Sequence, residues 1–174
     1  MCFLFGGGYH RTRKKTIVSD RAVILLVEDQ ENDVVLIRKA FEKGQVVNPL
    51  FVVRSGEEAM AYLAGDGKFR NRAEYPLPDL VLLDIKMPGL DGFDVLRWVR
   101  SQGGFSSLLV VMLTSSDRVY DVNQAYKLGA NSFLVKPLDF ENYIQTCHVL
   151  KQYWLNMNKR PETSREAEVS DQKS

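Results

Sequence analysis

Residues 80–92 read LVLLDIKMPGLDG, and this stretch decides the fold. The run 80–83 is apolar at every position, so neither face of a strand formed there would meet water. Asp84 ends the run, and the tight Met-Pro-Gly turn of residues 87–89 follows it. The pattern predicts a buried strand that presents one carboxylate where the strand ends.

Further apolar runs and helical patterns alternate on both sides of this strand. The predicted strands are 22–27, 50–53, 80–83, 108–113 and 132–135, and the predicted helices are 33–43, 55–63, 92–100, 117–128 and 139–155. Ser55 and Glu58 have the spacing of a capping box at the start of the second helix. Five repeats of strand then helix predict an α/β fold, with a parallel sheet covered by helices on both faces.

Length and charge bound the organisation of the chain. Its 174 residues, 45% of them hydrophobic and 26% charged, suit one folded domain with a core. The formal net charge of +1 divides into +4 for residues 1–21, −3 for residues 22–155 and 0 for residues 156–174. We predict a flexible basic N-terminal extension, a single domain and a disordered C-terminal tail over these three ranges.

Several classes of protein are disfavoured. Two cysteines and two histidines are too few for a zinc cluster or a disulfide framework, so a cytoplasmic location is predicted. No apolar run is long enough to span a membrane. Residues 1–5 are apolar, but basic residues follow them, which is the reverse of a secretory signal. We expect no DNA-binding domain, because no helix-turn-helix fits after residue 155.

Polar side chains collect where the predicted strands end. The residues that follow the strands are, in chain order, Glu28, Asp29, Asp84, Thr114, Ser115 and Lys136. Each of them alone would suit an ordinary loop or turn. In a parallel sheet, however, the carboxyl ends of the strands share one edge, and ligands bind beyond that edge. Taken together, these residues predict a functional site.

The residue types at this edge suit phosphoryl transfer. Clustered carboxylates repel one another and favour a hard divalent cation such as Mg²⁺, which neutralises the charge of an incoming phosphoryl group. Asp84 is the best candidate for a nucleophile that forms an acyl phosphate. Lys136 would contact one phosphoryl oxygen as a compact charge, and the hydroxyl of Thr114 would donate to another.

The chain resembles the receiver domain of two-component response regulators over about residues 22–155. The motifs that carry the resemblance are Glu28-Asp29, the 80–92 block, Thr114-Ser115 and Lys136-Pro137. It implies a flavodoxin-like (βα)5 fold, doubly wound with strand order 2-1-3-4-5. It also implies a signalling switch rather than an enzyme, although the switch catalyses its own phosphorylation and dephosphorylation. Asp84 would accept the phosphoryl group from the phosphohistidine of a sensor histidine kinase.

The same resemblance implies roles for individual residues. Asp29, Asp84 and the backbone carbonyl of Lys86 would bind Mg²⁺, with Glu28 acting through a metal-bound water. The Lys136-Pro137 peptide bond would be cis and would aim Lys136 at the site. The side chains that would tune the lifetime of the phosphoryl group are those of Lys86 and Ser116.

A conformational switch is also implied. Thr114 would move toward the phosphoryl group, and Phe133 would swing into the space that this movement opens. A plain core role for Phe133 is the alternative. The output surface would comprise the fourth helix, fifth strand and fifth helix, predicted over 117–128, 132–135 and 139–155.

A closer resemblance concerns the partner. The long segment 63–79 and the aromatic residues 153–155 are similar to those of single-domain regulators that partner phytochrome-type histidine kinases. The alternative is a tolerated surface insertion. Tyr153 and Leu155 lie off the apolar stripe of the last helix, and with Trp154 they are candidate contacts of a homodimer through the output surface.

Other functions stay open at this point. A phosphatase of the haloacid-dehalogenase type needs a second acid two residues after the nucleophile, where this chain has Lys86. A phosphorylation-independent binding module, such as a flavin carrier, could use the same fold. A stand-alone regulator would act through a partner protein, by relaying the phosphoryl group or as a phosphate sink.

Overall fold

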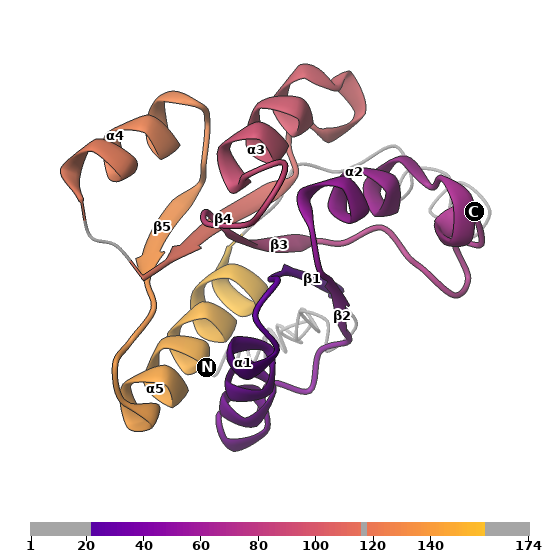
Figure 1. The fold of residues 1–174 in the computed structure, drawn as a ribbon. Coiled ribbons are helices and arrows are strands. Elements are labelled where there is room, and N and C mark those ends of the chain that lie inside the picture. Colours follow the sequence, from indigo (N-terminus) through magenta and orange to yellow (C-terminus); the bar gives the residue numbers. More distant parts are fainter. Residues whose placement is uncertain (1–21, 116–117, 159–174) are drawn as a thin grey trace, which may run out of the picture.

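A parallel five-stranded sheet organises residues 22–115 and 118–158, which are the residues described in this computed structural model. Its strand order, β2-β1-β3-β4-β5, is the predicted one (Figure 1). The strands are β1 (Ile24–Val27), β2 (Leu50–Val53), β3 (Leu80–Asp84), β4 (Leu109–Thr114) and β5 (Ser132–Val135). The central strands β1, β3 and β4 are buried at every position, whereas β2 and β5, at the two edges, are mostly half-buried.

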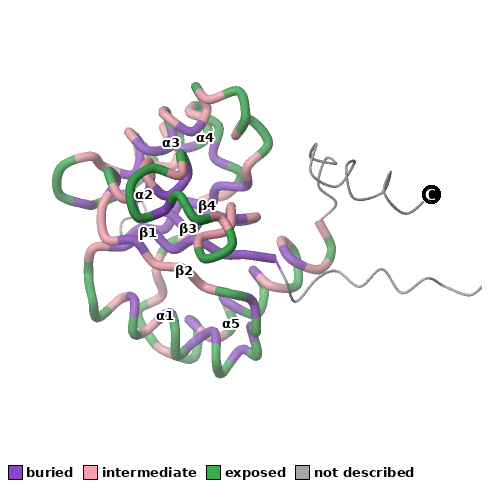
Figure 2. Tube along the Cα trace, turned by 90° about the vertical axis from the view of Figure 1, so that its right-hand side faces the viewer, coloured by how far each residue is buried: buried purple, intermediate pink, exposed green. Residues whose placement is uncertain are grey.

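Helices cover both faces of the sheet, as predicted (Figures 1 and 2). They are α1 (Glu31–Lys43), α2 (Gly56–Ala64), α3 (Gly92–Ser101), α4 (Val119–Lys127) and α5 (Phe140–Leu150), with short 3₁₀ turns η1 (Gly67–Arg70) and η2 (Gly103–Phe105). Helices α1 and α5 pack on one face, and α2, α3 and α4 lie on the other. Each face has its own hydrophobic core, so the sheet is fixed from both sides.

The register of the strands brings their carboxyl ends to one edge. Val27 of β1 pairs with Leu83 of β3, and Asp84 pairs with Leu113 of β4. Thr114, the last residue of β4, pairs with Val135 at the end of β5. The residues immediately after these pairs therefore surround one small region, as parallel pairing requires.

Side chains cap the starts of α2 and α3 in different ways. Ser55 caps α2 by accepting a hydrogen bond from the Glu58 backbone N–H at 3.2 Å. The Glu58 carboxylate, however, accepts from the Arg54 backbone N–H at 2.9 Å, one residue before the cap, so the predicted reciprocal box is only half formed. A complete capping box stands at the start of α3, between Asp91 and Asp94.

The segment between α2 and β3 is an ordered part of the fold. Four aromatic rings pack against one another there, from Phe51, Tyr62, Phe69 and Tyr75. The guanidinium of Arg72 donates to the backbone carbonyls of Tyr62 and Leu63, at 2.7 Å in both cases. These contacts anchor the long insertion to the end of α2.

One prediction for the C-terminal helix, that Leu155 is a surface contact, is wrong. Leu155 is only 3% exposed and belongs to the core beneath α1 and α5, so its predicted role as a surface contact is wrong for this structure. The reason is a change of helix type, because α5 continues as a π-helical segment, η3 (Lys151–Met157). A π-helix has more residues per turn, which rotates Leu155 away from the position that α-helical periodicity predicts. Trp154 is partly buried, and Tyr153 is exposed.

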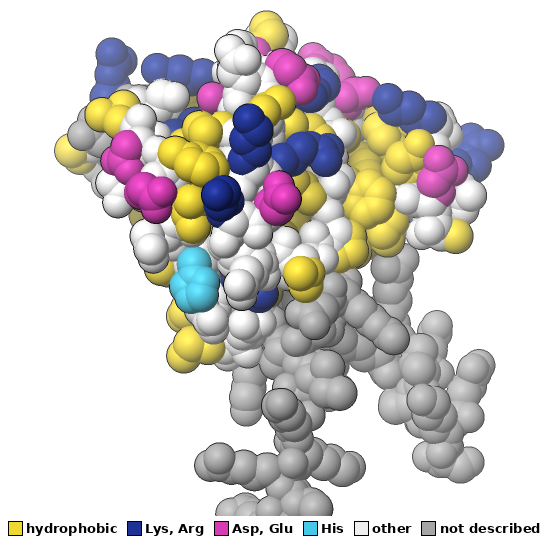
Figure 3. Space-filling view, turned by 90° about the horizontal axis from the view of Figure 1, so that it is seen from below, with side chains coloured by type: hydrophobic (Ala, Val, Ile, Leu, Met, Phe, Trp, Pro, Cys, Tyr) yellow, Lys and Arg dark blue, Asp and Glu magenta, His cyan; other side chains and the backbone are white. Residues whose placement is uncertain are grey.

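The surface around α1 and α5 carries mixed charges. Figure 3, which views the molecule from below relative to Figure 1, shows basic, acidic and apolar side chains interspersed on this face. No described helix is both long enough and apolar enough to cross a membrane. The predicted extension 1–21, most of the predicted tail 156–174 and Ser116 lie outside the described residues.

Candidate functional site

The strand ends assemble a largely buried polar site. Glu28 follows β1, Asp84 is the last residue of β3, Thr114 is the last residue of β4 and Lys136 follows β5. The side chains of Glu28, Asp84 and Thr114 are buried, although all three are polar. Burying polar groups is costly unless they are paired, so their partners determine what this site can do.

Three carboxylates gather in one cluster. Glu28, Asp29 and Asp84 each offer an oxygen, and these oxygens all lie within 4.8 Å of one another. The buried Oδ1 of Asp29 has no hydrogen-bond partner among the described residues, whereas its Oδ2 accepts from the Gln30 side chain at 2.6 Å. Three close carboxylates with one unsatisfied oxygen fit a hard divalent cation.

Lys136 supplies the positive charge of the site. Its ammonium lies 2.6 Å from Glu28 Oε2, 2.7 Å from Asp33 Oδ2 and 3.0 Å from Asp84 Oδ1. All described peptide bonds are trans, so the cis Lys136-Pro137 bond that the sequence led us to expect is not present. Trans is the intrinsically favoured form of an X-Pro bond, and Lys136 reaches the carboxylates with it.

Asp33 is a site residue that the sequence analysis missed. The sequence pattern predicts Asp33 only as the start of a helix, yet in the structure it lies in the first turn of α1 and its carboxylate accepts a hydrogen bond from Lys136. No local pattern in the sequence indicates this contact, because Asp33 and Lys136 lie 103 residues apart and meet only in the folded domain.

Burial and charge shift the proton affinities at this site. Burial raises the pKa of Glu28 and of Asp84, and this effect outweighs the opposing attraction of Lys136. Burial opposes the charge on Lys136, but hydrogen bonds to Asp33 and Glu28 and the charges of Asp84 and Glu28 raise its pKa overall. The site therefore holds a cation beside two carboxylates whose charged form is disfavoured by burial, and a further positive charge there would favour that form.

Lys86, Phe133 and Thr114 are further described residues that the sequence predicted for this site. The Lys86 backbone N–H donates to Asp84 Oδ2 at 3.0 Å, so the chain turns directly over that carboxylate. Phe133 pairs in register with Met112 of β4 and is half-buried against the core on the α2, α3 and α4 side. Thr114 accepts a backbone hydrogen bond from the Lys136 N–H at 2.7 Å, which joins β4 to the start of the lysine loop.

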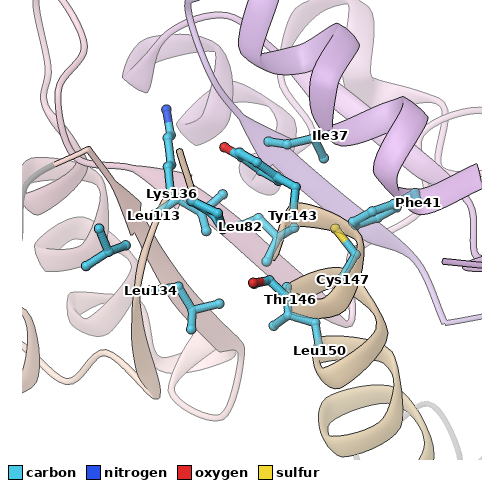
Figure 4. A pocket seen from close by; sticks show the side chains of 12 residues that line it. Ile37, Phe41, Leu82, Leu113, Leu134, Lys136, Tyr143, Thr146, Cys147 and Leu150 are labelled. Carbon is cyan, nitrogen blue, oxygen red and sulfur yellow. The ribbon is translucent and has the colours of Figure 1, made fainter. Parts of the chain in front are cut away.

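A small apolar pocket lies beside Lys136 and is lined by residues of β3, β4, β5, α1 and α5 (Figure 4). Its volume of about 20 Å³ is room for roughly one water molecule. Figure 4 shows the Lys136 nitrogen turned away from the apolar side chains of this pocket. The buried thiol of Cys147 lines the pocket, and burial raises its pKa to about 12. The polar chemistry thus lies on the carboxylate side of Lys136.

Comparison with known proteins identifies the family. Residues 24–148 match the response regulator receiver domain. The chain belongs to this family. Its members act in two-component signalling, and the resemblance predicted from the strand-end residues is confirmed.

Individual relatives cover most of this chain. The probable methanogenesis regulatory protein FilR2 of Methanothrix harundinacea is 36% identical over 142 residues, which span 82% of this chain and 89% of FilR2. Response regulator Rcp1 of Synechocystis is 32% identical over 76% of this chain and 88% of its own length.

Solved structures extend the similarity to regulators of light signalling. A response regulator in red light signalling of R. palustris has a TM-score of 0.78 at 32% identity, covering 82% of this chain and 99% of that one. The phosphorylated cyanobacterial phytochrome response regulator RcpA has a TM-score of 0.75 at 32% identity, with the same two coverages. The bacteriophytochrome response regulator RtBRR is 39% identical, with a TM-score of 0.66 over 87% of this chain and 90% of that one.

Proposed function

We propose that Asp84 is the phosphoacceptor of this receiver domain. One observation carries the proposal: the buried Asp84 carboxylate lies 3.0 Å from the Lys136 ammonium and inside a cluster of three carboxylates. A carboxylate in this setting is held in place for attack, and a neighbouring cation is ready to compensate charge on the group it receives.

The reaction transfers a phosphoryl group between two side chains. An Asp84 oxygen attacks the phosphorus of a phosphohistidine, the P–N bond breaks, and the histidine ring leaves with its electron pair and takes up a proton. Lys136 then contacts a phosphoryl oxygen, and the Thr114 hydroxyl donates to another. A Mg²⁺ ion held by Asp29, Asp84 and the Lys86 carbonyl, with Glu28 acting through water, would neutralise charge on the phosphoryl oxygens.

The phosphoryl group would switch the face formed by α4, β5 and α5. Thr114 is buried at the end of β4, and its neighbour strand carries Phe133, so movement of Thr114 alters the packing of that strand. The group adds charge and strong acceptors at one point, which biases the domain between two arrangements. The Lys86 and Ser116 side chains would govern how fast water removes it.

The partner we propose is a sensor histidine kinase of the phytochrome type. Similarity to RcpA and to RtBRR supports this choice, since both are named as phytochrome response regulators. The free, buried Cys147 is compatible with the reducing cytoplasm in which we expect the protein to act.

A homodimer through the α4, β5 and α5 face is a further part of this proposal. A surface groove of about 720 Å³ lies along β5 and α5, lined by apolar residues that include Val135, Leu138, Val149 and Tyr153. Light scattering with Mg²⁺ and beryllofluoride, a mimic of the phosphoryl group, should detect a dimer. Tyr153→Glu should abolish it and Val35→Glu, on α1, should not; a strict monomer under these conditions contradicts the proposal.

Phosphorylation by acetyl phosphate tests the proposed function. With Mg²⁺, the wild type should gain the mass of one phosphoryl group in an acid-stable, alkali-labile adduct. Asp84→Asn should gain none, while Asp66→Asn, which alters an exposed carboxylate outside the site, should react like the wild type. If no adduct forms on the wild type under any condition, a phosphorylation-independent binding module becomes the better interpretation of this protein's function.

A further inference from the structure

The Lys136 ammonium donates hydrogen bonds to Glu28 and Asp33 and forms an ion pair with Asp84. An ammonium carries three N–H groups, and here three carboxylate oxygens surround it, from Glu28, Asp33 and Asp84. A phosphoryl oxygen that binds Lys136 therefore competes with these carboxylates for the ammonium. Which partner leaves is decided by the cost of leaving each carboxylate without the lysine.

The three partners differ in their access to water. The side chains of Glu28 and Asp84 are 0% and 6% exposed, whereas that of Asp33 is 31% exposed. Releasing Glu28 would leave a buried carboxylate without its cation, and Asp84 carries the phosphoryl group itself. Asp33 alone can exchange the lysine for water at small cost.

Helix α1 holds Asp33 in place for this exchange. Val34 and Ile37, on the same helix, are buried in the core, so the backbone of the first turns is anchored. Asp33 does not belong to the cluster of three carboxylates that fits a cation. Its contact with the site runs through Lys136.

We propose that Asp33 is the partner that Lys136 gives up for the phosphoryl group. Asp33 is then a positioning residue that holds the lysine in the resting state and sets how readily Asp84 is phosphorylated. This inference rests on the proposed function, because it assumes that a phosphoryl group arrives at Asp84. Removing the Asp33 charge frees Lys136 in advance and favours the phosphorylated state.

The experiment is a titration with beryllofluoride in saturating Mg²⁺. Asp33→Asn should bind beryllofluoride about fivefold more tightly than the wild type, as expected for an ion pair of partial exposure. Asp33→Glu keeps a carboxylate for Lys136 and should stay within about twofold of the wild type. Glu31→Gln removes the same charge from the same helical turn, but Glu31 pairs with Arg54, so its affinity should also stay near the wild-type value.

The possible outcomes distinguish the exchange at Asp33 from the proposed phosphorylation of Asp84. A purely structural role for Asp33 would lower the urea midpoint of Asp33→Asn and would not tighten binding. If the wild type binds beryllofluoride and Asp33→Asn binds it equally or more weakly, the exchange is wrong while the proposed function stands. If the wild type neither binds beryllofluoride nor reacts with acetyl phosphate, the proposed function fails and the exchange fails with it.

Discussion

Replacing Gly92 with alanine should damage both the fold and the site. Gly92 is the first residue of α3, and its backbone N–H donates to the Ile85 carbonyl at 3.0 Å. A Cβ added at Gly92 would lie 2.2 Å from the Asp84 carbonyl oxygen and 2.9 Å from the Ile85 Cα. Both are backbone atoms, so the start of α3 and the end of β3 would have to move apart.

The size of the effect follows from this overlap. Overpacking of this kind costs about 1–3 kcal/mol. With a urea dependence of about 1–3 kcal/mol per molar, the unfolding midpoint of Gly92→Ala should fall by about 1 M. Because the displaced atoms belong to Asp84 and its neighbour, the rate of phosphorylation by acetyl phosphate should fall as well.

Gly103→Ala is the matched control for this prediction. A Cβ at Gly103 would meet no atom within 4 Å, so the free energy of unfolding should change by no more than about 0.5 kcal/mol. Urea unfolding followed by circular dichroism measures both variants. A Gly92→Ala protein that unfolds at the wild-type midpoint would refute the packing argument.

Three more predictions follow from contacts elsewhere. Burial raises the pKa of Asp84, so the stability that its protonated form contributes at acidic pH is lost as pH rises through that pKa. In the absence of metal, Asp84→Asn should therefore unfold at a higher urea concentration than the wild type at pH 7, with a smaller difference near pH 4, about the ordinary carboxyl pKa. Equal urea midpoints at pH 7 would contradict this prediction. Burial raises the pKa of Cys147 to about 12, so little reactive thiolate is present at mildly alkaline pH. In a Cys2→Ser background, the Cys147 thiol should react with a disulfide reagent only as the protein unfolds. Rapid labelling of the folded protein would contradict this prediction. Arg72→Ala loses three hydrogen bonds to backbone carbonyls, at about 1 kcal/mol each, and should speed amide exchange over residues 65–79. Unchanged exchange would show that Arg72 does not anchor the segment.

Much of the fold was predictable because hydrophobic pattern and burial agree in a parallel sheet. The predicted ranges of β2 and β5 match the structure, and those of the other strands differ by one or two residues. The strand-end rule then placed Glu28, Asp29, Asp84 and Lys136 together without knowledge of any side-chain position. Strand ends are topological features, so the pattern alone is enough to find them.

What the sequence did not predict depends on contacts between distant residues. Helix α1 starts two residues earlier than predicted, and Asp33 in its first turn contacts Lys136, which is 103 residues away in the sequence. Leu155 is buried because the last helix changes to π geometry, which a period of 3.6 residues does not represent. The segment before β3 is ordered by Arg72 and by ring packing, and neither leaves a periodic signal.

The most direct test is the location of the phosphoryl group. Sodium borohydride converts an aspartyl phosphate to homoserine, and tandem mass spectrometry then locates the converted residue. After treatment with acetyl phosphate, homoserine should appear at position 84 in the presence of Mg²⁺ and should be absent when the metal is chelated. Conversion at Asp29, at any other acidic residue, or at none would contradict the assignment of Asp84 as the phosphoacceptor.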